Sequence, residues 1–251
     1  MCAVGYDNLP TNFEQVLSLP MREATGVAAD PTQDVARPHH GAVLVGPPTW
    51  AQQPVSNLTY MTFGAGDALT LAALATVPPT DMDFATVAGV VGGFSYAAWM
   101  RSTSLAAIQT LWCYGGATDG LQISITATNG EIQFITYQAA ANQVTDTATA
   151  CVVVDIWWFI AVTCDGNWDT GQALIYRNAI DVTLLHPSHI SPLTAAARDA
   201  YVGAHDDQAG PPGAPELSFI GNMWNPRCWT RALPQIQCWE IFEMERNLFS
   251  V

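Results

Sequence analysis

Lysine is absent from this sequence of 251 residues, and all eight basic side chains are arginines. Aspartate and glutamate number 22, so the formal net charge is −14. Nucleic acids, anionic membranes and acidic polymers are bound through basic patches, because such patches offset the negative charge of the partner. The charge balance therefore argues against these three classes of partner.

Charged residues of either sign are also scarce. They make up 12% of the chain, whereas an ordinary soluble domain carries about 25%. Hydrophobic residues make up 49%, which is enough for a large core. The deficit of charge predicts that partners cover part of the surface. We expect these partners to be other copies of the chain and a larger protein lattice, with residues 1–14 as an N-terminal arm that orders on binding.

Long apolar runs, secretion signals and paired cysteines are missing as well. The most apolar stretch, residues 151–162, is interrupted by Asp155 and falls short of the ~18 residues of a membrane span. No basic segment followed by an apolar one opens the chain, so we expect neither a signal peptide nor a transmembrane segment. The six cysteines form no C-x-x-C pair, which disfavours zinc and redox motifs and predicts buried free thiols.

Residues 157–182 carry the clearest structural pattern. Apolar residues alternate along two arms: Ile160, Val162 and Cys164 in the first, and Leu174 and Tyr176 in the second. This period of two predicts two half-buried strands joined by a turn. A second, tight turn follows at Asn178 and Ala179. If that turn is of type I′, Ala179 has a positive φ, at a cost of about 1 kcal/mol.

Other short segments of strand character follow one another along the chain. The expected strands are residues 16–20, 41–45, 58–63, 68–71, 94–100, 108–114, 121–127, 131–137, 199–204 and 219–233. One helix is expected at about residues 235–246, packed across one sheet or one end of the sandwich. The pattern predicts an all-β protein with a single domain at residues 15–251.

Several motifs in this order resemble the laminin-G-like branch of the concanavalin A-type jelly rolls. In the opening region the matching residues are Leu19, Glu23, Gly26, Asp30, His40, Gly41, Val43, Gly46, Pro47 and Trp50. The strand F-S-Y-A-A-W-M-R from residue 94, the hairpin from Trp157 to Gly166 and the W-x-R-A-L sequence from residue 229 also match the family. The resemblance implies a two-sheet antiparallel jelly-roll sandwich with a short C-terminal helix.

The end of the chain, residues 245–249, resembles the endings of laminin-G-like proteins from bacteriophages. This resemblance implies a non-catalytic virion structural protein, such as a capsid decoration protein or a tail-associated jelly roll. Such a protein acts through protein–protein contacts and is located in the virion after assembly in the host cytoplasm. A glycan-binding module or adhesin is the alternative, and a glycoside hydrolase is a third reading.

Catalytic carboxylates are not expected. Jelly-roll glucanases of the laminarinase type carry an E-x-D-x-x-E motif on one strand, so that alternate carboxylates converge on one sugar. No expected strand of this chain carries that triplet. Glu240, Glu243 and Glu245 are spaced similarly, but they lie on the expected helix and are interpreted as a solvated face.

No cofactor is expected, and calcium is doubtful. Laminin-G relatives carry two acidic residues in the closing strand, and this chain has Trp224 and Asn225 there. An amide is a weaker calcium ligand than a carboxylate, and an indole is none. His186 and His189 are three residues apart, and we interpret them as surface-loop residues rather than a metal pair.

Two candidate contact sites remain. In the turn between the hairpin arms, Trp168 is a candidate platform for a sugar, with His205, Asp206 and Asp207 binding its hydroxyl groups; alternatively, Trp168 only anchors the end of the hairpin. Trp157 and Phe159 give the first hairpin strand a second apolar face, which must also be covered. The cover is either the chain's own loops or a neighbouring subunit, and we expect a protein interface there.

Overall fold

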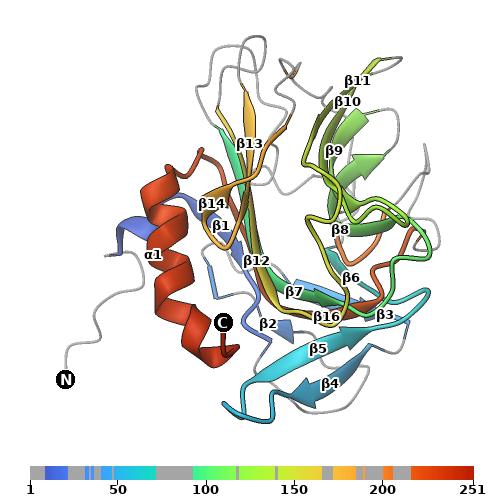
Figure 1. The fold of residues 1–251 in the computed structure, drawn as a ribbon, viewed down its shortest axis with the longest axis vertical. Helices are drawn as coiled ribbons and strands as arrows, with labels where there is room; N and C mark the ends of the chain where they lie inside the picture. Colours follow the sequence, from blue (N-terminus) through green and yellow to red (C-terminus); the bar gives the residue numbers. More distant parts are fainter. Residues whose placement is uncertain are drawn as a thin grey trace.

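Two antiparallel sheets packed face to face form the protein, with one helix against the outer face of the first sheet (Figure 1). The computed structural model describes residues 9–21, 32–33, 35–36, 41–46, 48–71, 93–116, 119–138, 141–165, 172–184, 189, 200–205 and 216–251. The expected jelly-roll sandwich with a C-terminal helix is confirmed. No helix in the described part of the chain is long and apolar enough to cross a membrane.

The first sheet has its central strands in the order β13, β12, β7 and β16. Its full order is β14 (Ile180–Asp181), β13 (Ala173–Arg177), β12 (Trp158–Cys164), β7 (Phe94–Ser102), β16 (Gly221–Trp229), β5 (Thr59–Phe63) and β4 (Thr49–Gln52), with β1 (Gln15–Ser18) also paired to β16. The second sheet runs β11 (Ala141–Asp146), β10 (Ile132–Gln138), β9 (Asp119–Ile125), β8 (Gln109–Gly116), β15 (Ala200–Val202), β6 (Ala68–Leu71), β3 (Gly41–Val45) and β2 (Thr32–Gln33). The expected central hairpin is β12 and β13.

The core lies between the two sheets and is dominated by aromatic rings. Phe94 of β7 stacks on Trp112 of β8 at 5.1 Å and on Phe134 of β10 at 5.6 Å between ring centroids. Because side chains alternate along a strand, Phe94 and Tyr96 point into this core, while Ser95, Ala97 and Trp99 point to the outer face. The outer face of the first sheet therefore also needs a cover.

The C-terminal segment supplies that cover. Helix α1 (Gln235–Glu245) and the 3₁₀ turn Arg246–Leu248 run along the outer face of the first sheet (Figure 1). Phe242 of α1 lies 5.8 Å from Trp99 and 6.1 Å from Phe159, and Phe249 stacks on Trp99 at 4.2 Å. The strand that is apolar on both faces is thus buried on both faces by its own chain.

This arrangement corrects the expectation of a protein interface at Trp157 and Phe159. Phe159 is fully buried and Trp157 is 6% exposed. Trp157 packs between Tyr60, at 5.3 Å, and Phe249, at 4.7 Å. Of the two covers that the sequence left open, the chain's own C-terminal segment is the one present, so neither ring offers a surface to a partner.

The second half of the expected N-terminal arm packs on the closing strand. The Trp229 indole N–H donates to the carbonyl of Thr11 at 2.7 Å, and the Arg231 guanidinium donates to the carbonyls of Pro10 and Phe13, both at 2.8 Å. Residues 9–14 are therefore part of the sandwich. Residues 1–8 lie outside the described residues.

Five cysteines in the described part of the chain are free and buried, as expected: Cys113, Cys151, Cys164, Cys228 and Cys238. Burial is the main cause that raises the pKa of the Cys238 thiol to about 12, and it raises the pKa of Cys164 further. These thiols stay protonated at neutral pH, which makes them poor nucleophiles. Cys2 lies outside the described residues.

The tight turn after β13 has the backbone that the sequence predicted. Asn178 has φ 50° and Ala179 has φ 63°, and the Asn178 carboxamide accepts a hydrogen bond from the Phe159 N–H at 3.1 Å. Ala179→Gly should raise the free energy of unfolding by roughly 0.5–1 kcal/mol, because glycine adopts this φ without steric cost.

Urea unfolding of purified protein measures this change. Ala173→Gly is the matched control, because Ala173 lies inside a strand, where glycine should destabilise. Destabilisation by both variants would contradict the assignment of strain to Ala179.

Candidate functional site

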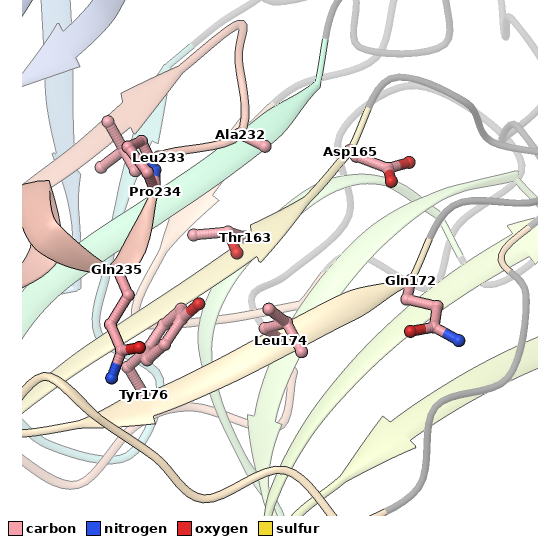
Figure 2. Close-up of a pocket in the computed structure, with 9 residues that line it drawn as sticks. All are labelled: Thr163, Asp165, Gln172, Leu174, Tyr176, Ala232, Leu233, Pro234 and Gln235. Atoms are coloured by element: carbon pink, nitrogen blue, oxygen red, sulfur yellow. The ribbon is translucent and has the colours of Figure 1, made fainter.

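A groove of about 490 Å³ opens on the outer face of the first sheet, beside the start of α1. Its lining residues are Thr163, Asp165, Gln172, Leu174, Tyr176, Ala232, Leu233, Pro234 and Gln235. Figure 2 shows Asp165 and Gln172 at one end, Tyr176 and Gln235 at the other, and Thr163 and Leu174 between them. The groove is the part of this face that the helix leaves uncovered.

Strand register explains the floor of the groove. Thr163 of β12 is paired with Leu174 of β13, and Ala161 with Tyr176, so Thr163, Leu174 and Tyr176 share the outer face. The wall is held against β7 by Ser95, whose hydroxyl donates to the carbonyl of Arg231 at 2.7 Å and accepts from the Leu233 N–H at 2.8 Å. A local hairpin and a segment about sixty residues later in the chain therefore meet at this site.

The groove combines hydrogen-bonding groups with an apolar floor. Asp165 and Gln172 are exposed, and Leu174 is half-buried. Burial is the main cause that raises the pKa of Tyr176 to about 12, with smaller contributions from Cys238 and Asp181, while a hydrogen bond with Thr163 lowers it. The phenol is therefore neutral at physiological pH. A carboxylate, two amides and an apolar surface suit a ligand that carries hydroxyl groups on one face and C–H groups on the other.

A second hollow of about 410 Å³ adjoins the first. It is lined by Ala179, Gln235, Ile236 and Trp239, so Gln235 belongs to both. We expected α1 to pack with its apolar residues against the sandwich, and Cys238, Ile241 and Phe242 do so. Ile236 and Trp239 instead face outward, with 58% and 49% of their surface exposed. No signal in the sequence distinguished the two apolar sets.

The residues of the expected sugar site are only partly described. Trp168, Asp206 and Asp207 lie outside the described residues. Asp165 and Gln172, which flank Trp168 in the chain, both line the groove. His205 is buried beside Tyr137 at 6.3 Å, on the outer face of the second sheet. Since the groove lies on the outer face of the first sheet, the structure does not bring His205 to it.

The helix carboxylates are only partly a solvated face. Glu240 is exposed, and Glu243 pairs with Arg246 at 3.0 Å on the helix surface. Glu245, in contrast, accepts hydrogen bonds from Arg227 at 2.8 and 2.9 Å and from the Trp99 indole N–H at 2.9 Å. It is therefore a structural anchor beneath the helix, which corrects the expectation for this residue.

The positions that were weighed for metal binding have structural contacts. The Asn225 carboxamide accepts a hydrogen bond from Ser18 at 3.2 Å, and Trp224 packs against Phe249 at 5.6 Å. No group of three or more His, Cys, Asp or Glu side chains in the described residues is placed to hold a metal ion.

His189 is buried, not part of a surface loop, which corrects that expectation. Its ring nitrogens lie 2.8 Å from the Thr136 hydroxyl and 2.7 Å from the Thr145 hydroxyl. Burial lowers the pKa of the imidazole to about 4. His186 lies outside the described residues.

Solved structures with this fold include receptor-binding domains of botulinum neurotoxins. One is titled as the binding domain of botulinum neurotoxin DC in complex with SialylT (13% identity, TM-score 0.63), and another as the same domain in complex with rat synaptotagmin II (14%, 0.62). A third title describes cell entry of botulinum neurotoxin type C that depends on two ganglioside molecules (15%, 0.62). Each match covers 93% of this chain and 52% of the other, so this chain spans about half of their length.

At such identities the likeness shows the fold alone. No curated protein matches the chain in sequence. A laminin-G family model, described as the concanavalin A-like lectin/glucanases superfamily, matches residues 66–237, which is more than half of the sequence. The matched region includes β12, β13 and the wall of the groove. The chain therefore belongs to the concanavalin A-like lectin/glucanases superfamily.

Proposed function

We propose that this protein is a non-catalytic glycan-binding module, and that the groove beside α1 is its binding site. The observation that carries the proposal is the groove itself, in which Asp165, Gln172 and Gln235 surround a floor of Thr163, Leu174 and Tyr176. Carboxylate and amide groups bind the hydroxyl groups of a sugar, and the apolar floor suits its C–H face. In this proposal Trp168, in the turn that the groove residues flank, supplies an additional ring.

The likeness to binding domains supports this reading. The titles of the structural neighbours name a ganglioside, a SialylT ligand and a protein receptor as their partners. Neither the family match nor these neighbours point to a virion protein, so the reading as a capsid or tail protein has no support from them. Protein contacts, with residues 1–14 as a strap, are the second route by which such a module would act.

Catalysis is disfavoured by the chemistry of the groove. Asp165 is the one carboxylate that lines it among the described residues, whereas glycoside hydrolysis uses a pair about 5–9.5 Å apart. The superfamily includes glucanases, so this point needs its own test. Release of reducing sugar from laminarin by the purified protein, abolished in Asp165→Asn, would show that the site is an active site.

Glycan-array binding of the purified protein tests the proposal. Asp165→Ala should weaken binding at least tenfold, because a hydrogen bond to a charged group contributes about 1.5–3 kcal/mol. Trp168→Ala should weaken it by a similar factor. Asp155→Ala is the matched control, because Asp155 is also exposed but pairs with Arg101 away from the groove. Absence of binding to every glycan, or equal binding by all variants, would contradict the proposal.

A further inference from the structure

We infer that the groove and the hollow at Trp239 form one extended site, which takes an uncharged oligosaccharide of several sugar units. In this inference the sugar chain runs from Asp165 and Gln172 to a stacking position on the indole of Trp239. The inference rests on the proposed function and adds to it the length and the charge class of the ligand.

The two hollows are joined through one side chain. Gln235 lines both, and its Nε2 donates to the carbonyl of Ala179, which lines the second hollow, at 3.2 Å. Residues 172–176 extend along the floor for about 13 Å at 3.3 Å per strand residue. Trp239 lies one helical turn after Gln235, which adds about 6 Å along α1. A ligand that reaches both ends is therefore longer than one sugar ring.

Trp239 has the properties of a stacking platform. Its side chain is half exposed, and no hydrogen bond or ring contact of Trp239 is recorded in the described part of the chain. The neighbouring Ile236 is also exposed and lines the same hollow. Tryptophan rings exposed on a rigid helix offer a large apolar area at little cost in conformational entropy. The helix is held in place by Glu245, so the ring is presented in a fixed position.

The charges around the site select against anionic sugars. No arginine or histidine lines either hollow among the described residues, and the chain has no lysine. Asp165 lines one end, Glu240 follows Trp239 in an exposed position, and the whole chain has a net charge of −14. A sialylated or sulfated glycan would meet repulsion at this surface, whereas a neutral one would not.

Isothermal titration of the full chain tests the inference. The probes are β-1,3-glucose, β-1,4-glucose and β-1,4-N-acetylglucosamine oligomers of two to six units, and a sialylated glycan of equal length. We expect the affinity for at least one neutral series to rise about tenfold or more from two to six units. Trp239→Ala should remove that rise and leave the binding of the shortest oligomers unchanged. The sialylated glycan should bind at least tenfold more weakly.

Two variants serve as controls. Trp239→Phe should restore most of the gain, because it keeps a flat ring, and Trp158→Ala should have no effect, because Trp158 lies against Arg177 outside both hollows. Equal affinity for short and long oligomers, an unchanged Trp239→Ala variant, or preferred binding of the sialylated glycan would overturn this inference while the proposed function stands. Absence of binding to every probe, neutral or sialylated, would overturn both.

Discussion

Glu245→Ala should lower the free energy of unfolding by about 3–5 kcal/mol, the largest effect that we expect from a single substitution. Removal of one partner of a buried ion pair leaves the other charge without compensation in a medium of low polarity. The pair here is well shielded, because the side chains of Arg227 and Glu245 are 8% and 13% exposed. The variant also leaves the Trp99 indole N–H without its acceptor, which adds to the cost.

The position of this pair explains its importance. Arg227 belongs to β16 in the middle of the first sheet, whereas Glu245 ends α1, so the pair fixes the helix to the sheet. Phe242 and Phe249 pack on Trp99 beside it, and their packing depends on the helix staying in place. Because α1 and the residues before it form one wall of the groove, loosening of the helix should also weaken glycan binding.

Urea unfolding followed by tryptophan fluorescence measures the loss. In the double variant Arg227→Met with Glu245→Leu no charge remains unpaired, and only the Trp99 N–H loses its acceptor, so the loss should shrink to about 1–3 kcal/mol. Glu243→Ala is the surface control, because its pair with Arg246 is exposed and should contribute less than 1 kcal/mol. A loss of similar size from Glu245→Ala and Glu243→Ala would contradict the role of the buried pair.

Strand alternation and turn residues predicted most of the fold. The hairpin of β12 and β13, the left-handed turn at Ala179 and the limits of α1 all follow from local patterns, and the structure has them. Strand β11 was not expected, because its sequence ANQVTD has few apolar residues and follows no apolar alternation. It is an edge strand, paired on one side to β10, where a strand of this polarity is tolerated.

The candidate site was predicted only in part, because its walls come from separate regions of the chain. Asp165 and Gln172 flank a turn that the sequence had singled out, but nothing local indicates that residues 232–235 lie against it. The outward position of Trp239 was also hidden, since its helix has apolar residues on both sides and only the packing of Phe242 decides which side is buried. Contacts between distant residues, such as Trp99 with Glu245, decide these matters.

Acid should destabilise the protein through His189, and this is the second large effect that we expect. The imidazole lies between two threonines that come from adjacent strands, Thr136 of β10 and Thr145 of β11. The Thr136 hydroxyl donates to the Gln143 carboxamide at 3.0 Å, so it accepts from Nδ1–H of His189. Nε2 then accepts from the Thr145 hydroxyl, and protonation of Nε2 removes that acceptor.

The direction of the pH effect follows from the lowered pKa. In the unfolded chain His189 has a pKa of about 6.5, and in the folded protein burial lowers it to about 4. Between these values the unfolded state binds a proton that the folded state does not. Stability is therefore complete above about pH 6.5 and falls as the pH is lowered towards 4, by about 3 kcal/mol in total.

The comparison of wild type with His189→Gln isolates this effect, because glutamine keeps polar atoms but does not titrate. Burial raises the pKa of the neighbouring Asp146, with a smaller contribution from Glu131, so that carboxyl stabilises the folded state as the pH falls and opposes the histidine. It does so equally in both proteins and cancels in the difference. We expect the free energy of unfolding of wild type, relative to the variant, to fall by about 3 kcal/mol between pH 7 and pH 4 in urea unfolding. Parallel curves for the two proteins over this range would show that His189 does not cause the acid sensitivity.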